Sequence, residues 1–102
     1  MTKGFVSTMR KGFRMTFPNG LAVSVQWGAG NYCDNYNDTD FTFSKDAKSD
    51  TAEVAVIDSH GEFIDPQRFF DYEINSDGMV AGHLDPSQVV ELLANVRDWP
   101  NI

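Results

Sequence analysis

The side chains best able to do chemistry in this sequence are one cysteine and two histidines, Cys33, His60 and His83. A cysteine becomes a nucleophile when a histidine within hydrogen-bonding reach accepts its proton. No basic residue stands next to Cys33, and Asp34 follows it directly, so the local charge disfavours the thiolate. The three side chains also lack the paired spacing of a zinc site. We therefore expect a packed, unreactive cysteine, and we assign no catalytic and no metal-binding residue.

The segment DNYNDTDFTFSK, residues 34–45, is rich in the oxygen ligands that calcium prefers. The register of an EF-hand loop fails, however. With Asp34 at position 1, Thr39 takes position 6 instead of glycine and Lys45 takes position 12 instead of glutamate. A calcium site of another geometry stays open. The pattern favours a turn-rich loop in which Asn and Asp side chains cap their own backbone.

The segment WGAGNYCDNY, residues 27–36, combines aromatic faces, amide edges and glycines. Its G-x-G pattern permits close backbone approach, but the third glycine and the following helix of a dinucleotide-binding loop are missing. The mixture suits a base or nucleotide ligand, and equally a protein-binding hot spot. The alternative is that Trp27 packs in the core and the glycines only turn the chain. The predicted binding residues are Trp27, Gly28, Gly30, Asn31, Tyr32, Asn35 and Tyr36.

A strongly patterned hairpin should hold this loop in place. Residues 13–17 and 21–27 alternate large apolar with polar or small side chains, and the PNG at 18–20 supplies the turn. The large side chains of both strands then share one face. A loop that only joins two strands is typically about 2–5 residues long. Residues 28–38 make a loop of eleven, and we expect it to serve as a recognition surface.

The middle of the chain predicts further short strands. DFTFS at 40–44 is a candidate strand, and AEVAVID at 52–58 has apolar side chains on both faces, which is typical of a central strand. A turn then leads into a strand at 62–64, which makes a second hairpin. The Asp-Pro and Asp-Gly steps within 65–78 indicate irregular structure.

The C-terminal segment has the clearest helix signals. Asp85 is the predicted N-cap, Pro86 takes the first helical position, and Gln88 completes a capping box. Leu84 is spaced to pack on Val89 as a hydrophobic staple. The apolar face of the helix comprises Val89, Leu92, Leu93, Val96 and Trp99.

These elements predict an α+β domain. Its small antiparallel sheet has about four to five strands in two hairpins, and one C-terminal helix packs on one face. A chain of 102 residues fits a single domain, which we place at 13–102. Residues 1–12 lack periodicity and are expected to form a basic, flexible arm.

The charge is distributed unevenly. Residues 1–32 hold four bases and no acid, a charge of +4, whereas residues 33–102 hold four bases and fifteen acids, a charge of −11. Most of the surface should therefore repel nucleic acid, and an acidic face could dock on a basic partner. The single cysteine fits a reducing cytosol, and no apolar run is long enough to span a membrane.

Three stretches carry a resemblance: FPNGLAVSVQWGAGNYCDN, AEVAVIDSHGEF and VAGHLDPSQVVELL. They resemble a group of small uncharacterised proteins encoded by bacteriophages and prophages, which share an F-x-N-G hairpin, an S-V-Q-W-G-x-G-N-Y-C-x-N stretch, an A-E-V-A strand and a capped terminal helix. The resemblance covers residues 13–97, without the insertion-like segment 65–76. It implies a phage accessory protein in the host cytoplasm, and it carries over no functional residue.

Three functions are open at this point. The first is a non-catalytic protein, without a cofactor, that binds and inhibits or sequesters a host protein, as an anti-CRISPR inhibitor of host defence does. The second is a small-molecule or nucleotide-binding protein, a sponge for a signalling ligand, that uses residues 27–36. The third is a small hydrolase or nuclease, which ranks last because the fifteen carboxylates are dispersed along the chain.

Overall fold

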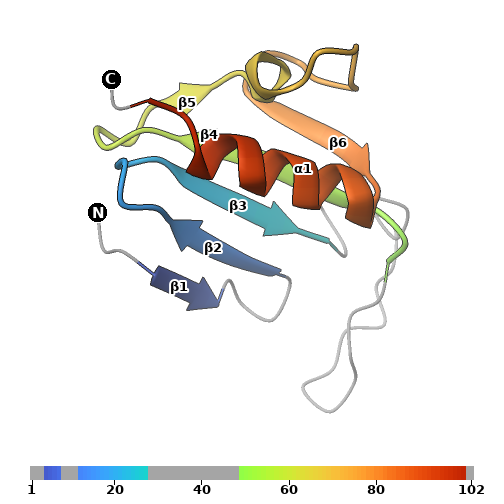
Figure 1. Ribbon diagram of the computed structural model, residues 1–102. Coiled ribbons are helices and arrows are strands. Elements are labelled where there is room, and N and C mark those ends of the chain that lie inside the picture. Colours follow the sequence, from blue (N-terminus) through green and yellow to red (C-terminus); the bar gives the residue numbers. More distant parts are fainter. Residues whose placement is uncertain (1–3, 8–11, 28–48, 101–102) are drawn as a thin grey trace.

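The computed structural model describes residues 4–7, 12–27 and 49–100. Six strands in these residues form one antiparallel sheet, and a single α-helix crosses one face of it (Figure 1). This arrangement confirms the predicted α+β fold. The elements are β1 (Gly4–Ser7), β2 (Gly12–Thr16), β3 (Ala22–Gln26), β4 (Ala52–Ile57), β5 (Phe63–Ile64), the 3-10 helix η1 (Pro66–Phe69), β6 (Val80–Leu84) and α1 (Pro86–Arg97).

The first hairpin joins β2 to β3 through the PNG turn. Phe17 donates its amide to the carbonyl of Leu21 at 2.8 Å, and Gly20 takes a φ of +90°. The turn also reaches the far end of the chain, because the Asn19 amide nitrogen donates to the carbonyls of Val96 at 2.8 Å and Trp99 at 3.0 Å. One asparagine side chain therefore satisfies carbonyls that the end of α1 leaves without helical partners.

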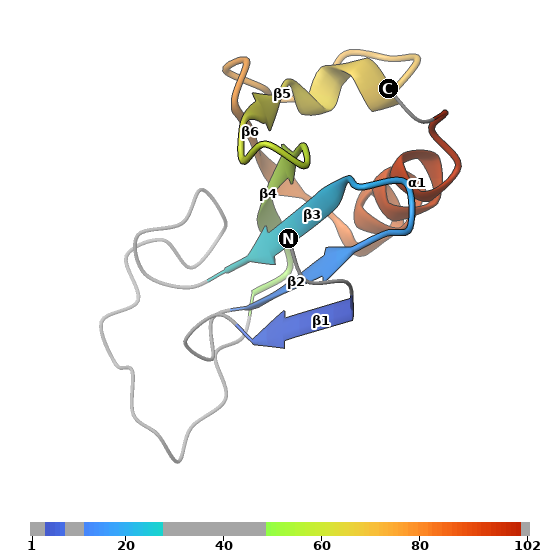
Figure 2. The ribbon, with the colours of Figure 1, turned by 90° about the vertical axis from the view of Figure 1, so that its left-hand side faces the viewer.

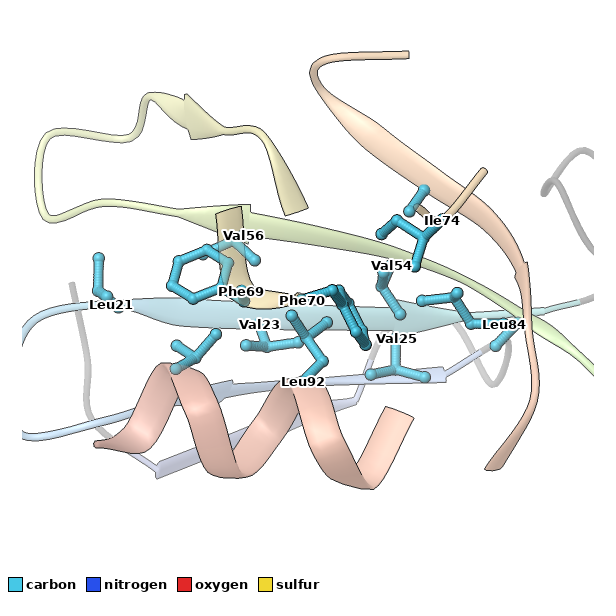
Figure 3. Close-up of a cluster of buried hydrophobic side chains, with 13 residues drawn as sticks. Leu21, Val23, Val25, Val54, Val56, Phe69, Phe70, Ile74, Leu84 and Leu92 are labelled. Atoms are coloured by element: carbon cyan, nitrogen blue, oxygen red, sulfur yellow. The ribbon is translucent and has the colours of Figure 1, made fainter. Parts of the chain in front are cut away.

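The strand β4 is central, as predicted. It pairs with β3 along one edge and with both β5 and β6 along the other. The side chains of Val54 and Val56 on β4 point toward α1 and have no exposed surface. They pack with Val23 and Val25 of β3 and with Leu92 of α1 in the hydrophobic core (Figure 3).

The helix begins as predicted. The Asp85 carboxylate accepts the Gln88 amide at 2.8 Å, and the Gln88 side chain accepts the Asp85 amide at 3.0 Å. Leu92 and Val96 are the fully buried residues of α1, whereas Leu93 is only partly buried. Seen along the sheet, α1 lies entirely on one side (Figure 2).

Within the segment 1–12, which is expected from the sequence to be a basic, flexible arm, the described residues 4–7 form a strand. Gly4–Ser7 forms β1, which pairs antiparallel with β2 from Gly4–Thr16 to Ser7–Phe13. The physical reason is that β2 offers a second edge of backbone groups, which a neighbouring segment can satisfy whatever its side-chain pattern.

Two further elements depart from the sequence interpretation. β6 was not predicted, because a bulge opposite Ala52–Val54 interrupts its alternation and His83 takes a φ of +56° there. η1 lies in the segment expected to be irregular. The predicted strand at 40–44 lies outside the described residues.

Candidate functional site

Among the predicted binding residues, the structure describes only Trp27, which directly follows β3. Its side chain is half-buried and packs against the hydrophobic core, as do Phe13 and Leu93. This placement agrees with the core interpretation of Trp27, and its part in binding stays a prediction. Six predicted binding residues and the lone cysteine lie outside the described residues: Gly28, Gly30, Asn31, Tyr32, Asn35, Tyr36 and Cys33.

The two histidines lie at opposite ends of β4. His60 belongs to the turn after β4, where its amide donates to the Asp58 carboxylate at 2.8 Å, and His83 lies in the bulge beside the start of β4. About five strand residues separate these positions, which corresponds to roughly 17 Å. The pair therefore cannot share one site. No group of three or more His, Cys, Asp or Glu side chains among the described residues could hold a metal ion.

Trp27 borders an apolar groove of about 370 Å³ between the start of α1 and the ends of β2 and β3. Its polar lining comes from residues 49–51. We call it the apolar groove, and its other lining residues are Phe13, Val25, Trp27, Ala52, Leu84, Pro86, Val89, Val90 and Leu93.

A second hollow of about 590 Å³ lies between η1 and the C-terminal half of α1. Its walls combine carboxylates with aromatic rings. We call it the acidic cleft, and its lining residues are Arg68, Phe69, Phe70, Asp71, Glu91, Asn95, Asp98 and Trp99.

Short polar contacts hold η1 in place on one side of the acidic cleft. Asp65 caps η1 by accepting the Gln67 amide at 3.0 Å, and the Ser76 hydroxyl donates to the same carboxylate oxygen at 2.6 Å. The Gln67 side chain accepts the Ile74 amide at 2.9 Å and donates to the Tyr72 carbonyl at 2.8 Å. The segment 65–76 is thus held by its own side chains as well as by the sheet, since the Gly82 amide of β6 donates to the Asn75 carbonyl at 2.9 Å.

One contact joins η1 to α1 and another joins it to the residues just after α1, and together they form the floor of the acidic cleft. Asn95 donates its side-chain amide to the Phe69 carbonyl at 2.7 Å. The Phe69 and Trp99 rings meet edge to face, with centroids 4.7 Å apart and planes at 64°. Phe69 is buried, whereas Trp99 is partly exposed and lines the cleft.

The carboxylates of the acidic cleft come from both walls. Asp71 follows η1, Glu91 lies on the same face of α1 as Asn95, and Asp98 is the C-cap residue directly after α1. Arg97 donates from Nε and from a terminal nitrogen to the Asp98 carboxylate at 2.9 and 3.0 Å. This side-chain hydrogen bond lowers the pKa of Asp98. Among the described lining residues, Arg68 is the one base.

The acidic cleft lies in the acidic part of the chain. Residues 49–102 hold eleven acids and two arginines, a charge of −9. At neutral pH this part of the surface attracts cations and repels phosphates.

The acidic cleft was not predicted from the sequence, although the sequence contains a signal for one of its walls. Glu91, Asn95 and Asp98 repeat at the same i, i+4, i+7 spacing as the apolar face of the helix. Such a polar stripe is usually only solvated, and the partner wall could not be foreseen because the segment 65–78 was expected to be irregular.

The chain matches no protein-family model, no curated protein and no solved structure. Among the described residues, no helix has both the length and the apolar character needed to cross a membrane.

Proposed function

We propose that the protein is a non-catalytic binding protein that holds a basic segment of a partner protein in the acidic cleft. The observation that carries this proposal is the combination of the Asp71 and Glu91 carboxylates with the partly exposed Trp99 ring, whereas Asp98 is already paired with Arg97. Guanidinium and ammonium groups bind carboxylates by charge-assisted hydrogen bonds and stack on indole faces. An acidic hollow with an aromatic floor suits arginine or lysine better than any anionic or neutral group.

The uneven charge supports the same partner chemistry. Basic surfaces on cellular proteins commonly serve to grip nucleic acid, and a protein with a charge of −9 over residues 49–102 competes for such surfaces. Together with the resemblance to phage-encoded proteins, this favours an accessory protein that acts in the host cytoplasm. Its target is then a host factor with a basic groove, and inhibition of host defence in the manner of an anti-CRISPR protein is the proposed outcome.

A defined cationic probe tests the chemistry of the acidic cleft. Calorimetric titration with a capped hexa-arginine peptide should show binding that the double variant Asp71→Asn/Glu91→Gln weakens by about tenfold or more. The matched control is Asp50→Asn/Glu62→Gln, which removes the same charge from exposed positions outside the acidic cleft. The control should stay within about twofold of the parent protein. Equal losses in both double variants would show that only net charge attracts the probe.

The aromatic floor has its own test. Trp99→Leu keeps an apolar side chain at this position but removes the ring, so hexa-arginine affinity should fall about threefold or more. Acetylated, amidated hexalysine should lose less than hexa-arginine, because arginine stacks on indole more readily. If Trp99→Leu binds both peptides as the parent does, the ring takes no part in recognition.

The apolar groove favours a second candidate function, the binding of a small molecule. Its volume of about 370 Å³ falls within the usual range for ligand pockets, and Trp27 offers a partly exposed ring. Among the described residues its lining includes Asp50 and no lysine or arginine, which favours an uncharged ligand over a phosphate. A neutral aromatic ligand is therefore proposed, in place of a charged nucleotide.

Adenosine and AMP form a matched pair of probes for the apolar groove. Adenosine should shift the Trp27 indole N–H resonance, AMP should bind more weakly, and Leu93→Gln should abolish the shift. Val90→Gln alters a groove residue that is 65% exposed and should weaken the interaction less. AMP binding as tightly as adenosine would contradict an uncharged ligand.

A further inference from the structure

The outer edge of β1 is an open edge of the sheet among the described residues, at the end of the sheet opposite β5 and β6. β1 pairs with β2 on one side, and no described strand pairs with it on the other (Figure 1). All four of its residues are exposed. An edge of this kind presents backbone groups to which another extended segment can pair.

The direction of these backbone groups follows from the hydrogen-bond pattern of the hairpin. In an antiparallel ladder, successive residues turn their amide and carbonyl alternately toward one neighbour strand and the other. Phe17 donates to the Leu21 carbonyl, so Phe17 faces β3, and Met15 and Phe13 do the same two and four residues earlier. The same alternation, followed from β2 through β3 to β4, predicts that Asp58 and Glu62 form a hydrogen-bonded pair. The structure agrees, because the Asp58 amide donates to the Glu62 carbonyl at 2.9 Å.

The alternation assigns the backbone groups of β1. Arg14 and Thr16 of β2 must face β1, where they stand opposite Val6 and Gly4. Val6 therefore turns its amide and carbonyl toward β2. Phe5 and Ser7 turn theirs toward the open edge.

The two faces of β1 differ in chemistry. Phe5 stands opposite Met15 on the face that carries α1 and is 78% exposed. Val6 stands opposite Arg14 on the other face and is 38% exposed. A segment added along β1 would thus meet an aromatic ring on one face and an arginine on the other.

The Arg14 side chain has a hydrogen-bond donor that a partner could use. It is half-buried, its Nε is shielded from solvent, and no described residue accepts a hydrogen bond from that Nε. Ser24, its neighbour on β3, carries no charge. The sequence adds Lys3 just before β1 and Arg10 and Lys11 shortly after it, with no acid in residues 1–32.

We infer that the open edge of β1 takes up an extended, acidic segment of a partner protein as an additional strand. Phe5 and Ser7 supply the backbone hydrogen bonds. A residue of the added strand opposite Val6 lies two strand spacings from Arg14, roughly 9.6 Å between backbones, which arginine and glutamate side chains together can span. The recognised pattern is therefore glutamate or aspartate on the Arg14 face and apolar residues on the Phe5 face.

Charge decides between this occupant and a second copy of the chain. Pairing β1 with β1 of another copy would bring two strands with basic flanks together, and like charges on neighbouring strands are destabilising. An acidic segment has the complementary sign. This site is separate from the acidic cleft, which takes a cation.

The test uses the full chain and two designed peptides, acetyl-EVEFEVE-amide and acetyl-KVKFKVK-amide. Calorimetry with the Asp71→Asn/Glu91→Gln variant, in which the acidic cleft has lost these two charges, should show binding of the glutamate peptide and none of the lysine peptide. Ser7→Pro removes one outward amide and leaves the Val6 pairing intact, so it should weaken binding about tenfold or more. Ser7→Ala, the matched control, keeps the amide and should stay within about twofold. Arg14→Gln should weaken binding about fivefold.

Several results would overturn the inference. Ser7→Pro must melt at the same temperature as Ser7→Ala, and equal peptide affinity in these two variants would rule out strand addition. Equal binding of both peptides, or binding of neither, would contradict the proposal that the partner segment is acidic. Binding of a short oligothymidylate that competes with the glutamate peptide would assign the surface to nucleic acid. A dimer in sedimentation equilibrium that Ser7→Pro dissociates would assign it to a second copy.

Discussion

β4 lies in the middle of the sheet and β1 at its edge, and the two strands differ in nearly every contact they make. β4 pairs along both edges and lies under α1, where Val54 and Val56 have no exposed surface. Among the described strands, β1 pairs along one edge only, and Phe5 is 78% exposed. The two strands therefore differ both in the number of described partner strands and in the burial of their side chains.

This difference indicates which parts of the molecule stabilise the fold and which can bind a partner. Apolar burial contributes about 25 cal/mol for each Å² removed from water, so the region of β3, β4 and α1 holds most of the folding free energy. β1 contributes little to the core and can present its edge to a partner. Regions of low local stability are the ones from which binding elements are drawn.

The largest expected effect tests this contrast directly. Leu92→Ala should lower the free energy of unfolding by about 2–5 kcal/mol, because Leu92 is fully buried between α1 and the sheet. Phe5→Ala, which removes a larger side chain, should change it by only about 0.5 kcal/mol or less. Urea unfolding followed by circular dichroism measures both variants. Val90→Ala serves as the control on α1, since Val90 is 65% exposed.

The next effect concerns the contact that joins the first hairpin to the end of α1. Asn19→Ala should cost about 1–3 kcal/mol, because the Val96 and Trp99 carbonyls lose a donor and the Leu21 amide loses an acceptor. Thermal melts provide the measurement. Asn75→Ala is the control, because Asn75 is exposed and its amide lies 3.5 Å from the Gly82 carbonyl. Equal melting temperatures for Asn19→Ala and the parent protein would show that water replaces the Asn19 hydrogen bonds with no loss of stability.

A smaller effect is expected at the start of α1. Asp85→Ala should cost about 0.5–2 kcal/mol through loss of the cap on the Gln88 amide. Ser87→Ala changes an exposed neighbour and should leave the unfolding curve in place. If Asp85→Ala and Ser87→Ala have the same unfolding curve, the cap makes no measurable contribution to stability.

The features predicted correctly from sequence all depend on local signals. The PNG turn, the Asp85–Gln88 capping box and the apolar stripe of α1 each involve residues a few positions apart, and their geometry follows from backbone preferences. β4 was predicted because a short run with apolar residues on both faces fits a central strand.

The features missed depend on distant partners. β1 has no periodic pattern of its own and exists because β2 offers a free edge. The acidic cleft needs Asn95 to meet Phe69, 26 positions away, and the end of α1 is held by Asn19, 77 positions from Val96. Within the apolar face, the sequence did not distinguish fully buried Leu92 from partly buried Leu93, since both fit the same stripe.

The smallest expected effect is a loss of stability at low pH, which should come from the acidic part of the chain and not from β1, β2 or β3. The Asp58 carboxylate accepts the amides of Glu62 and His60, and these hydrogen bonds, with that of Glu62 the largest cause, lower its pKa from the ordinary 3.8. A group whose pKa is lowered by folding stabilises the protein above its unfolded pKa, and this contribution disappears as the pH falls through the folded pKa. β1, β2 and β3 contain no carboxylate and cannot contribute to this loss.

Asp58→Asn keeps an acceptor oxygen in the turn but removes the titrating group. Its melting temperature should therefore fall less steeply than that of the parent between about pH 4 and about pH 2. Glu73→Gln is the control, because Glu73 is an exposed carboxylate whose side chain accepts no hydrogen bond from the described residues. The control should follow the parent profile. Asp77, whose pKa is lowered chiefly by the Val80 amide, should behave as Asp58 does when changed to asparagine. Identical acid profiles for all four proteins would show that these turns lose their hydrogen bonds without affecting the fold.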